Sequence, residues 1–276
     1  PAIDIPIPSE YVMGPGDNII VQFYGKENLS HALTINREGE IQFPKLGPIV
    51  VAGLSFADVK SLIMNTIDEQ MMGVKASVTM GALRSIRIFI LGEATLPGSY
   101  TVNSLSTMTN ALFASGGISR MGSLRNIQLK RGGQLITTLD LYSLLLKGDT
   151  SNDARLLPGD VIFIPPVGKT VGVSGEVRRP AIYELNKETT AAQVVSLAGG
   201  FLGTAYPQAS RIERINDNGE RTLVDVNLKT QHGKRLTIKD ADTLQVFSVL
   251  DTVENIVEIE GHVKRPGGSA WKPGLH

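Results

Sequence analysis

The sequence contains no cysteine, and this absence excludes several kinds of site at once. Disulfide frameworks, thiolate zinc sites and cysteine nucleophiles all require that residue. Aromatic residues are scarce as well, at 5% of the 276 residues. Tight sugar sites often stack sugar rings on aromatic side chains, so this scarcity argues against a high-affinity saccharide pocket.

An excess of charge of either sign is also missing. Lysine plus arginine and aspartate plus glutamate each number 27, which gives a formal net charge of zero. A protein that binds nucleic acid usually carries a basic excess or stripe, so no nucleic-acid partner is expected. The longest apolar runs, such as Ile88–Leu91 and Val161–Ile164, are far shorter than the ~20 residues that span a bilayer.

The start of the chain lacks a signal peptide. The sequence opens Pro1-Ala2-Ile3-Asp4, without a methionine, a basic start or an apolar run. It stops at Gly274-Leu275-His276. We therefore expect an excised piece of a longer protein.

Motifs that carry chemistry are not found. The four histidines have no metal-ligand spacing, and neither a phosphate-binding loop nor a Gly-x-Ser-x-Gly elbow occurs. Glu93 and Glu176 recur in similar surroundings. Recurrence favours a turn role, because glycoside hydrolysis needs two different carboxylates that converge. We predict a non-enzymatic protein with no catalytic residue, no metal and no cofactor.

One six-residue motif occurs three times. Gly92–Pro97 recurs as Gly175–Pro180, 83 residues later, and as Gly261–Pro266, 86 residues further on. Other landmarks keep nearly the same offset and pair Gly116-Gly117 with Gly199-Gly200, Leu139–Leu141 with Val224–Val226, and Gly148 with Gly233. Self-similarity at a fixed period indicates repeated domains, so we predict a tandem repeat.

Each repeat has one predicted order of elements. A strand ends at the Gly-Glu turn, a second strand follows the proline, and a short helix ends at Gly116 or Gly199, because glycine tolerates the left-handed conformation at a helix end. A hairpin and a closing strand follow. The predicted strands are 86–91, 99–102, 127–131, 135–139 and 161–164, with counterparts at 170–174, 181–185, 212–215, 222–226 and 243–247. One helix on a small mixed sheet is a β-grasp-like arrangement of the α+β class.

Residues 11–83 lack the repeat pattern and predict a β-rich domain with one clear helix. The predicted strands lie at 18–24, 33–35, 41–43, 49–51 and 74–80. The second and third of these are expected to pair as a hairpin around Gly39. Ser55 with Asp58 approximates a capping box and predicts the start of the helix.

Four parts of the chain follow from these patterns. We expect the β-rich domain at 8–84, the first repeat at 85–168, the second repeat at 169–252, and the start of a truncated third repeat at 253–276.

Twelve residues are predicted to form turns and helix ends rather than to do chemistry, since proline and glycine supply the conformations that these positions need. They are Gly14, Pro15, Gly16, Asp17, Gly92, Pro97, Gly116, Gly117, Gly175, Pro180, Gly199 and Gly200.

Two basic pairs occupy the same place in successive repeats. They are Arg178-Arg179 and Lys264-Arg265, whereas the first repeat has Thr95-Leu96. One interpretation is contact with an acidic polymer or a neighbouring subunit. A solvated turn explains them as well and is favoured, because charged side chains in surface turns are common.

Taken in order, these motifs resemble the outer-membrane polysaccharide export (Wza-like) family. The first domain resembles its polysaccharide export domain, and the repeats resemble its soluble-ligand-binding β-grasp (SLBB) domains. The residues that carry the first likeness are Tyr11, Gly14–Asp17, Gly39, Phe43-Pro44, Leu46-Gly47 and Val51–Leu54. Those that carry the second are Gly92-Glu93, Pro97-Gly98, Gly116-Gly117 and Leu157–Val161.

The resemblance implies the periplasmic portion of a capsule or exopolysaccharide export protein, a scaffold in a translocation conduit. Family members typically form homo-oligomeric rings, pass the polysaccharide polymer through a cavity and meet an inner-membrane polymerisation and export protein. They associate with the outer membrane through parts that this sequence lacks. Three departures stand out: no lipid-bearing cysteine, no C-terminal amphipathic helix, and Asp240-Ala241-Asp242 in place of Pro158-Gly159-Asp160.

Two other functions stay open at this point. A periplasmic binding module could hold a soluble ligand or saccharide through its β-grasp repeats. A glycan-acting enzyme is the least favoured alternative, and two convergent carboxylates in a cleft would revive it.

Overall fold

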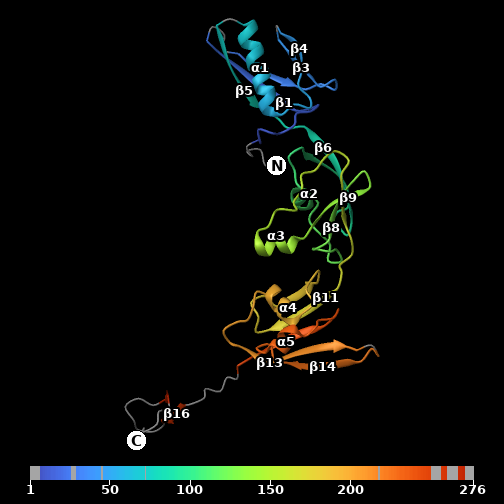
Figure 1. Cartoon of the computed structure of the whole chain (residues 1–276), viewed down its shortest axis with the longest axis vertical. Helices are drawn as coiled ribbons and strands as arrows, with labels where there is room; N and C mark the ends of the chain where they lie inside the picture. Colours follow the sequence, from blue (N-terminus) through green and yellow to red (C-terminus); the bar gives the residue numbers. More distant parts are fainter. Residues whose placement is uncertain are drawn as a thin grey trace. The chain divides into compact units, whose positions relative to one another are not determined.

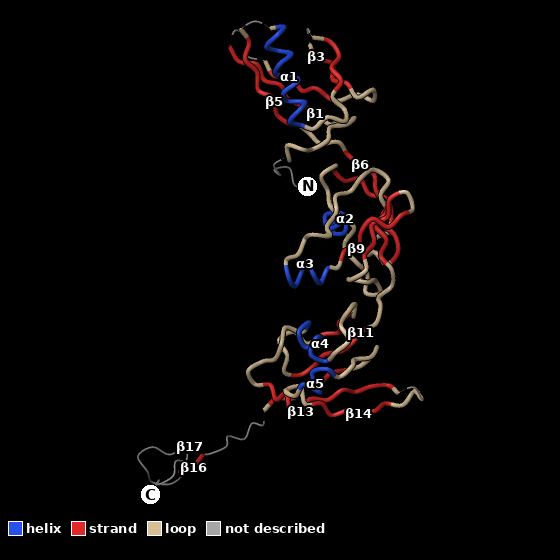
Figure 2. The backbone as a smooth tube through the Cα atoms, in the orientation of Figure 1, coloured by secondary structure: helices blue, strands red, loops and turns tan. Residues whose placement is uncertain are grey.

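The computed structural model describes residues 7–25, 29–44, 46–71, 73–216 and 218–249, with the backbone of 256–259 and 267–270. Contacts divide the chain into two compact units, Pro1–Pro166 and Val167–His276. Strands dominate and the helices are few (Figure 2), which confirms the α+β class. The domain boundaries near 84, 168 and 252 stay predictions.

The first domain is built on a three-stranded antiparallel sheet with a separate hairpin. Strand β1 is central, with β2 on one side and β5 on the other. The elements are β1 Asn18–Gly25, β2 Ser30–Thr34, β3 Glu40–Phe43, β4 Gly47–Val50, α1 Phe56–Gln70 and β5 Val74–Met80. Helix α1 lies against this sheet (Figure 1) and contacts β5.

Helix α1 begins where the sequence predicts. The Ser55 side chain accepts the backbone N–H of Asp58, which satisfies one of the free amides of the first turn. Val59, Ile63 and Ile67 are spaced by four residues and are buried. They therefore form one apolar stripe that covers the sheet.

The predicted hairpin between 33–35 and 41–43 is wrong. Strand β2 pairs with β1, and β3 pairs with β4. Ile35, at the end of the first segment, exchanges backbone hydrogen bonds with the 14–17 turn: Ile35 donates to Asp17 and accepts from Gly16, both at 2.9 Å. The backbone that the hairpin would use is therefore already paired.

The first repeat is a five-stranded mixed sheet. The strand order is β7-β6-β10-β8-β9, with β10 parallel to β6 and antiparallel to β8. Its elements are β6 Ser85–Gly92, β7 Gly98–Asn103, α2 Met108–Ala114, β8 Ile127–Arg131, β9 Gln134–Leu139, α3 Leu141–Lys147 and β10 Val161–Ile164. Met108, Ala111 and Leu112 of α2 join Ile88 and Ile90 in the core.

The second repeat has the same strand order, β12-β11-β15-β13-β14, again with a parallel central pair. Its elements are β11 Thr170–Gly175, β12 Ala181–Glu184, α4 Ala191–Leu197, β13 Ala205–Ile215, β14 Arg221–Val226, α5 Gln231–Arg235 and β15 Thr243–Ser248. Because the strands follow the same order in both sheets, the structure agrees with the tandem repeat predicted from spacing.

Strand register shows the same periodicity as the motif. Ile90 pairs with Gly98 in the first repeat, and Val173 pairs with Ala181 in the second. Beyond them, β16 Ile256–Ile259 pairs with β17 Gly267–Ala270 so that Ile259 faces Gly267. This third hairpin matches the opening of the repeats and supports the proposed start of a third one.

Each repeat has a second short helix that the sequence analysis missed. Helices α3 and α5 follow the hairpins of their repeats. The landmark that paired Asp140 with Asp225 is also wrong. Ile127 pairs with Leu139 and Ser210 with Val226, so Asp140 corresponds to Asn227. Both side chains accept a backbone N–H two residues later, from Tyr142 and Lys229.

The remaining landmark, Gly148 with Gly233, fails as well. Gly148 ends α3 at a φ of 70°, whereas Gly233 lies inside α5. The loop between β13 and β14 is longer than the loop between β8 and β9. Residues after this loop are therefore further from their counterparts in the first repeat than the residues before it. Among the helices in the part of the chain that is described, none has the length and apolarity needed to cross a membrane.

Candidate functional site

One buried aspartate lies immediately before a strand in each domain. The side chains of Asp17, Asp160 and Asp242 are all 0% exposed, and these residues precede β1, β10 and β15. Each carboxylate accepts the backbone N–H three residues earlier, at 3.0 Å from Gly14, 2.8 Å from Leu157 and 2.8 Å from Lys239. This contact closes a turn, here named the Asp turn, at the entrance of the strand.

The backbone of each Asp turn docks on a neighbouring strand. Gly159 donates to the carbonyl of Arg87, and the Asp160 carbonyl accepts from Phe89. Ala241 and Asp242 make the equivalent bonds to Thr170 and Gly172. The turn therefore fixes where the closing strand enters the sheet of its repeat.

Arginine neutralises each buried carboxylate. The Arg131 guanidinium donates two hydrogen bonds of 2.8 Å to the Asp160 carboxylate. The Arg214 guanidinium donates two to Asp242, at 2.9 and 2.6 Å. A planar guanidinium matches a carboxylate in this two-bond geometry. These hydrogen bonds raise the pKa of both arginines, which therefore stay protonated.

The third residue of each turn has a left-handed backbone. Gly16 has a φ of 94° and Gly159 one of 83°, and glycine adopts such values without steric cost. Ala241 holds the same position at 62° and is the one non-glycine residue with positive φ among the described residues. The departure from Pro-Gly-Asp noted in the sequence is therefore a point of backbone strain.

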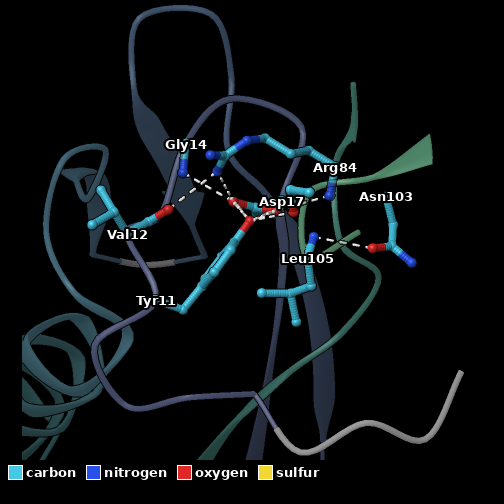
Figure 3. A network of polar contacts seen from close by, with 8 residues as sticks. Tyr11, Val12, Gly14, Asp17, Arg84, Asn103 and Leu105 are labelled. Carbon is cyan, nitrogen blue, oxygen red and sulfur yellow. Dashed lines mark hydrogen bonds and ion pairs between the residues drawn. The ribbon is translucent and has the colours of Figure 1, made fainter. Parts of the chain in front are cut away.

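The first Asp turn has more side-chain partners than the other two, and Figure 3 shows its network around Asp17. The Tyr11 hydroxyl donates to both oxygens of Asp17, at 2.9 and 3.0 Å. Arg84 donates from its backbone N–H at 2.8 Å and also forms an ion pair with Asp17. Arg84 lies between β5 and β6, so the carboxylate holds the segment that leaves the first domain.

The Tyr11 hydroxyl also meets the first repeat. It lies 2.6 Å from the Oγ of Ser104, which follows β7, and both residues are buried. Because the phenol proton goes to Asp17, the serine hydroxyl is the donor in this contact. Burial raises the pKa of Tyr11 to about 12, partly offset by the hydrogen bond from Ser104.

The Gly-Glu turns show why glycine opens the repeated motif. A Cβ on Gly92 would lie 2.1 Å from the Ile164 carbonyl oxygen, and one on Gly175 would lie 1.9 Å from that of Val246. Both glycines also have positive φ. The following residues, Glu93 and Glu176, donate their backbone N–H groups to the same two carbonyls at 2.9 Å.

The two recurring glutamates each form a hydrogen bond within their own repeat. The Glu93 side chain accepts from the Ser119 hydroxyl in the first repeat, and that of Glu176 accepts from Thr204 in the second. Each hydrogen bond therefore links the Gly-Glu turn to another loop of the same repeat. Among the described residues, no group of three or more histidine, aspartate or glutamate side chains could hold a metal ion.

The glycine pairs end helices in a shared geometry. In the first repeat Gly117 donates to Leu112 and Gly116 to Phe113; in the second, Gly200 donates to Val195 and Gly199 to Ser196. These are the paired bonds of a Schellman motif. All four glycines have positive φ, the conformation that this motif requires.

The basic pair of the second repeat lies beside one of these helix ends. The backbone N–H groups of Arg178 and Arg179 donate to Gly200 and Ala198, and the Arg179 guanidinium donates to the Leu197 carbonyl at 3.2 Å. Both side chains are exposed. A cation at a helix C-terminus is favourable, so Arg179 has a structural role. Lys264 and Arg265 lie outside the described residues.

The sequence analysis predicted the Asp17 turn, noted the segment with Asp160 only for its resemblance, and missed the partners of both carboxylates. Arg84, Ser104, Arg131 and Arg214 were not singled out, and Tyr11 was noted only for its resemblance. The signal available was an arginine at the end of an apolar strand in both repeats, 29 and 28 positions before the aspartate.

Comparison with known families agrees with this domain order. Residues 5–81 match the polysaccharide biosynthesis/export protein family, and residues 86–164 and 170–225 match SLBB domains. The chain is thus a polysaccharide biosynthesis/export domain followed by two SLBB domains, which confirms the predicted resemblance.

Two relatives are similar to this chain over about two thirds of its length. The polysialic acid transport protein KpsD of Escherichia coli is 27% identical over 65% of this chain. The EPS I polysaccharide export outer membrane protein EpsA of Ralstonia solanacearum is 31% identical over 66%. The matched region spans 32% of KpsD and 48% of EpsA, so the chain corresponds to less than half of either relative.

Proposed function

We propose that this chain is the periplasmic part of a capsule or exopolysaccharide export protein and acts as a non-catalytic scaffold. The observation that carries the proposal is the ordered match of one export domain and two SLBB domains, shared with relatives named for polysaccharide transport and export. The shared role of three buried carboxylates supports it, because Asp17, Asp160 and Asp242 all accept backbone N–H groups within turns.

The wider assembly is part of the same proposal. The full-length protein forms a homo-oligomeric ring at the outer membrane, receives polymer from an inner-membrane polymerisation and export protein, and guides it outward. The arginine pair Arg178-Arg179, with Lys264-Arg265, remains a proposed contact with polymer or a neighbouring subunit. Arg178 is the better candidate of the described two, because the Arg179 guanidinium already binds a helix end.

The alternative is a periplasmic module that holds a soluble ligand through its SLBB domains. The two proposals differ in what the full-length parent does in solution. A ring scaffold self-associates and shows no saturable small-ligand site, whereas a binding module is a monomer with such a site.

The test is the mass of the purified, lipidated full-length parent in detergent, measured by light scattering, together with calorimetric titration of short oligosaccharides of the exported polymer. We expect a mass that is a multiple of the chain mass and no saturable heat. A strictly monomeric parent that binds one oligosaccharide per chain would contradict the scaffold.

A further inference from the structure

The three Asp turns differ in where their partners come from. The arginine that neutralises Asp160 lies in the same repeat, on β8, and the one that neutralises Asp242 lies on β13. Asp17 instead binds Arg84, between the first domain and the first repeat, and reaches Ser104 through Tyr11. In the two repeats the Asp turn therefore binds only residues of its own domain, whereas the turn at Asp17 also binds residues at the boundary with the first repeat.

The contacts across this boundary form one continuous chain. Ser104 Oγ and Tyr11 are 93 positions apart in sequence yet hydrogen-bonded, and the backbone N–H of Ser104 donates to the Arg84 carbonyl at 3.0 Å. Leu105, the next residue, packs against the apolar core of the first domain. The loop after β7 therefore contributes both a polar and an apolar contact to the first domain.

Burial makes these contacts costly to lose. Tyr11 is 6% exposed, Asp17 0% and Ser104 8%. If the first repeat unfolded alone, the Tyr11 oxygen would lose its donor, and the site around Asp17 would open to water. A buried polar group without a partner destabilises its fold, so separation of the two domains is disfavoured.

We propose that the Tyr11–Asp17–Arg84–Ser104 cluster couples the folding of the export domain to that of the first SLBB repeat. Each domain stabilises the other through the shared hydrogen bond and through Leu105. Coupling between two sites is reciprocal, so loss of the shared hydrogen bond lowers the stability that each domain gains from the other by the same factor.

Native-state hydrogen exchange of the whole chain, read by mass spectrometry, tests this coupling. The probes are the amides of the buried strands β1 in the export domain and β6 in the first repeat. Tyr11→Phe and Ser104→Ala each remove one hydroxyl and keep the rest of the side chain. Ser104→Ala is expected to speed exchange about three- to tenfold in both strands, the range of one net hydrogen bond. Tyr11→Phe should speed exchange by at least as much, because its hydroxyl also donates to Asp17.

The double variant separates coupling from general destabilisation. In the Ser104→Ala background, Tyr11→Phe should have less effect on β6 than it has alone, because the shared bond is already gone. Tyr100→Phe is the matched control, since its hydroxyl donates to the Leu96 carbonyl within the first repeat. Its effect should be equal in both backgrounds.

Two results would overturn the proposal. One is that Tyr11→Phe leaves exchange in β6 unchanged while it speeds exchange in β1. The other is that Tyr11→Phe affects β6 equally with and without the Ser104 hydroxyl.

Discussion

A single buried carboxylate organises the entrance of a strand in each domain. The turns around Asp17 and Asp160 are predictable from sequence because Pro-Gly favours them. The ionic partners of Asp17, Asp160 and Asp242 are not predictable, because the arginines lie 67, 29 and 28 positions away and only the folded sheet brings them near. Residue identity thus predicted the turn, and tertiary packing determined the partner.

The strain at Ala241 gives a stability prediction. An L-residue in the left-handed region costs about 1–2 kcal/mol, whereas glycine gives back about 0.5–1 kcal/mol through its freer unfolded chain. Ala241→Gly should therefore stabilise the second repeat by about 0.5–1 kcal/mol in urea unfolding. The mirror change, Gly159→Ala, should destabilise the first repeat by a similar amount, since nothing crowds that Cβ. Equal signs for the two changes would contradict this account.

The buried ion pair of the second repeat should matter far more than a surface pair on the same sheet. Arg214→Met leaves Asp242, at 0% exposure, without its partner and should cost about 3 kcal/mol. Arg221→Met breaks a pair with Glu213 whose side chains are 80% and 43% exposed, and should change stability by about 0.5 kcal/mol or less. Comparable midpoints of thermal unfolding for the two variants would be inconsistent with this ranking.

Tyr11 gives a pH prediction. The fold raises the pKa of Tyr11 from 10.0 to about 12, so folding favours the protonated phenol. Its contribution is complete below pH 10 and is lost as the pH rises through 12. The stability difference between the wild-type chain and Tyr11→Phe should be constant up to pH 10 and shrink above it, as followed by urea unfolding at each pH. A difference that shrinks between pH 7 and 9 would rule out this assignment.

At the scale of elements, prediction succeeded where the pattern is local. The helix at Ser55, the Gly-Gly hairpin and the Gly116 and Gly199 helix ends all depend on neighbouring residues. Helix α3, none of whose residues is fully buried, was missed although Leu141, Leu144 and Leu145 have helical spacing. Its Asp140 cap and the left-handed Gly148 were the other available signals.

Helix α5 was missed for a different reason. It contains Gly233, and glycine disfavours a helix interior. The structure shows why glycine is needed there, because a Cβ would lie 2.0 Å from the Asn227 carbonyl oxygen. A tertiary close approach therefore overrides the local preference.

The glycines of the second repeat should rank by what surrounds them. Gly175→Ala places a Cβ against the Val246 backbone at 1.9 Å, whereas the nearest atoms to one on Gly199 belong to arginine side chains at 3.3 Å. Both changes strain a positive φ, at about 1–2 kcal/mol, and Gly175→Ala adds a backbone clash. Thermal unfolding should show the larger loss for Gly175→Ala. The reverse order would show that the Gly-Glu turn tolerates a side chain.

At the scale of the whole molecule, the resemblance to the polysaccharide export family depends on the order of the motifs, since each motif alone is weak. The repeat follows from spacing within the sequence, and strand register supports it down to the hairpin of β16 and β17. The proposed contacts of Arg178, Arg179, Lys264 and Arg265 with polymer or a subunit stay predictions. The two pairs recur with the repeat, as residues of a structural turn also would, so spacing alone could not distinguish a turn from a contact with a partner.

The distribution of polysaccharide in a producing cell that lacks the gene for the full-length parent tests the export role most directly. Polymer at the surface and polymer retained within the envelope are measured separately, with the restored gene as the control. The export role predicts that surface polymer is lost while chemically unchanged polymer accumulates inside. Normal surface polymer, or loss of the polymer from both compartments, would contradict it.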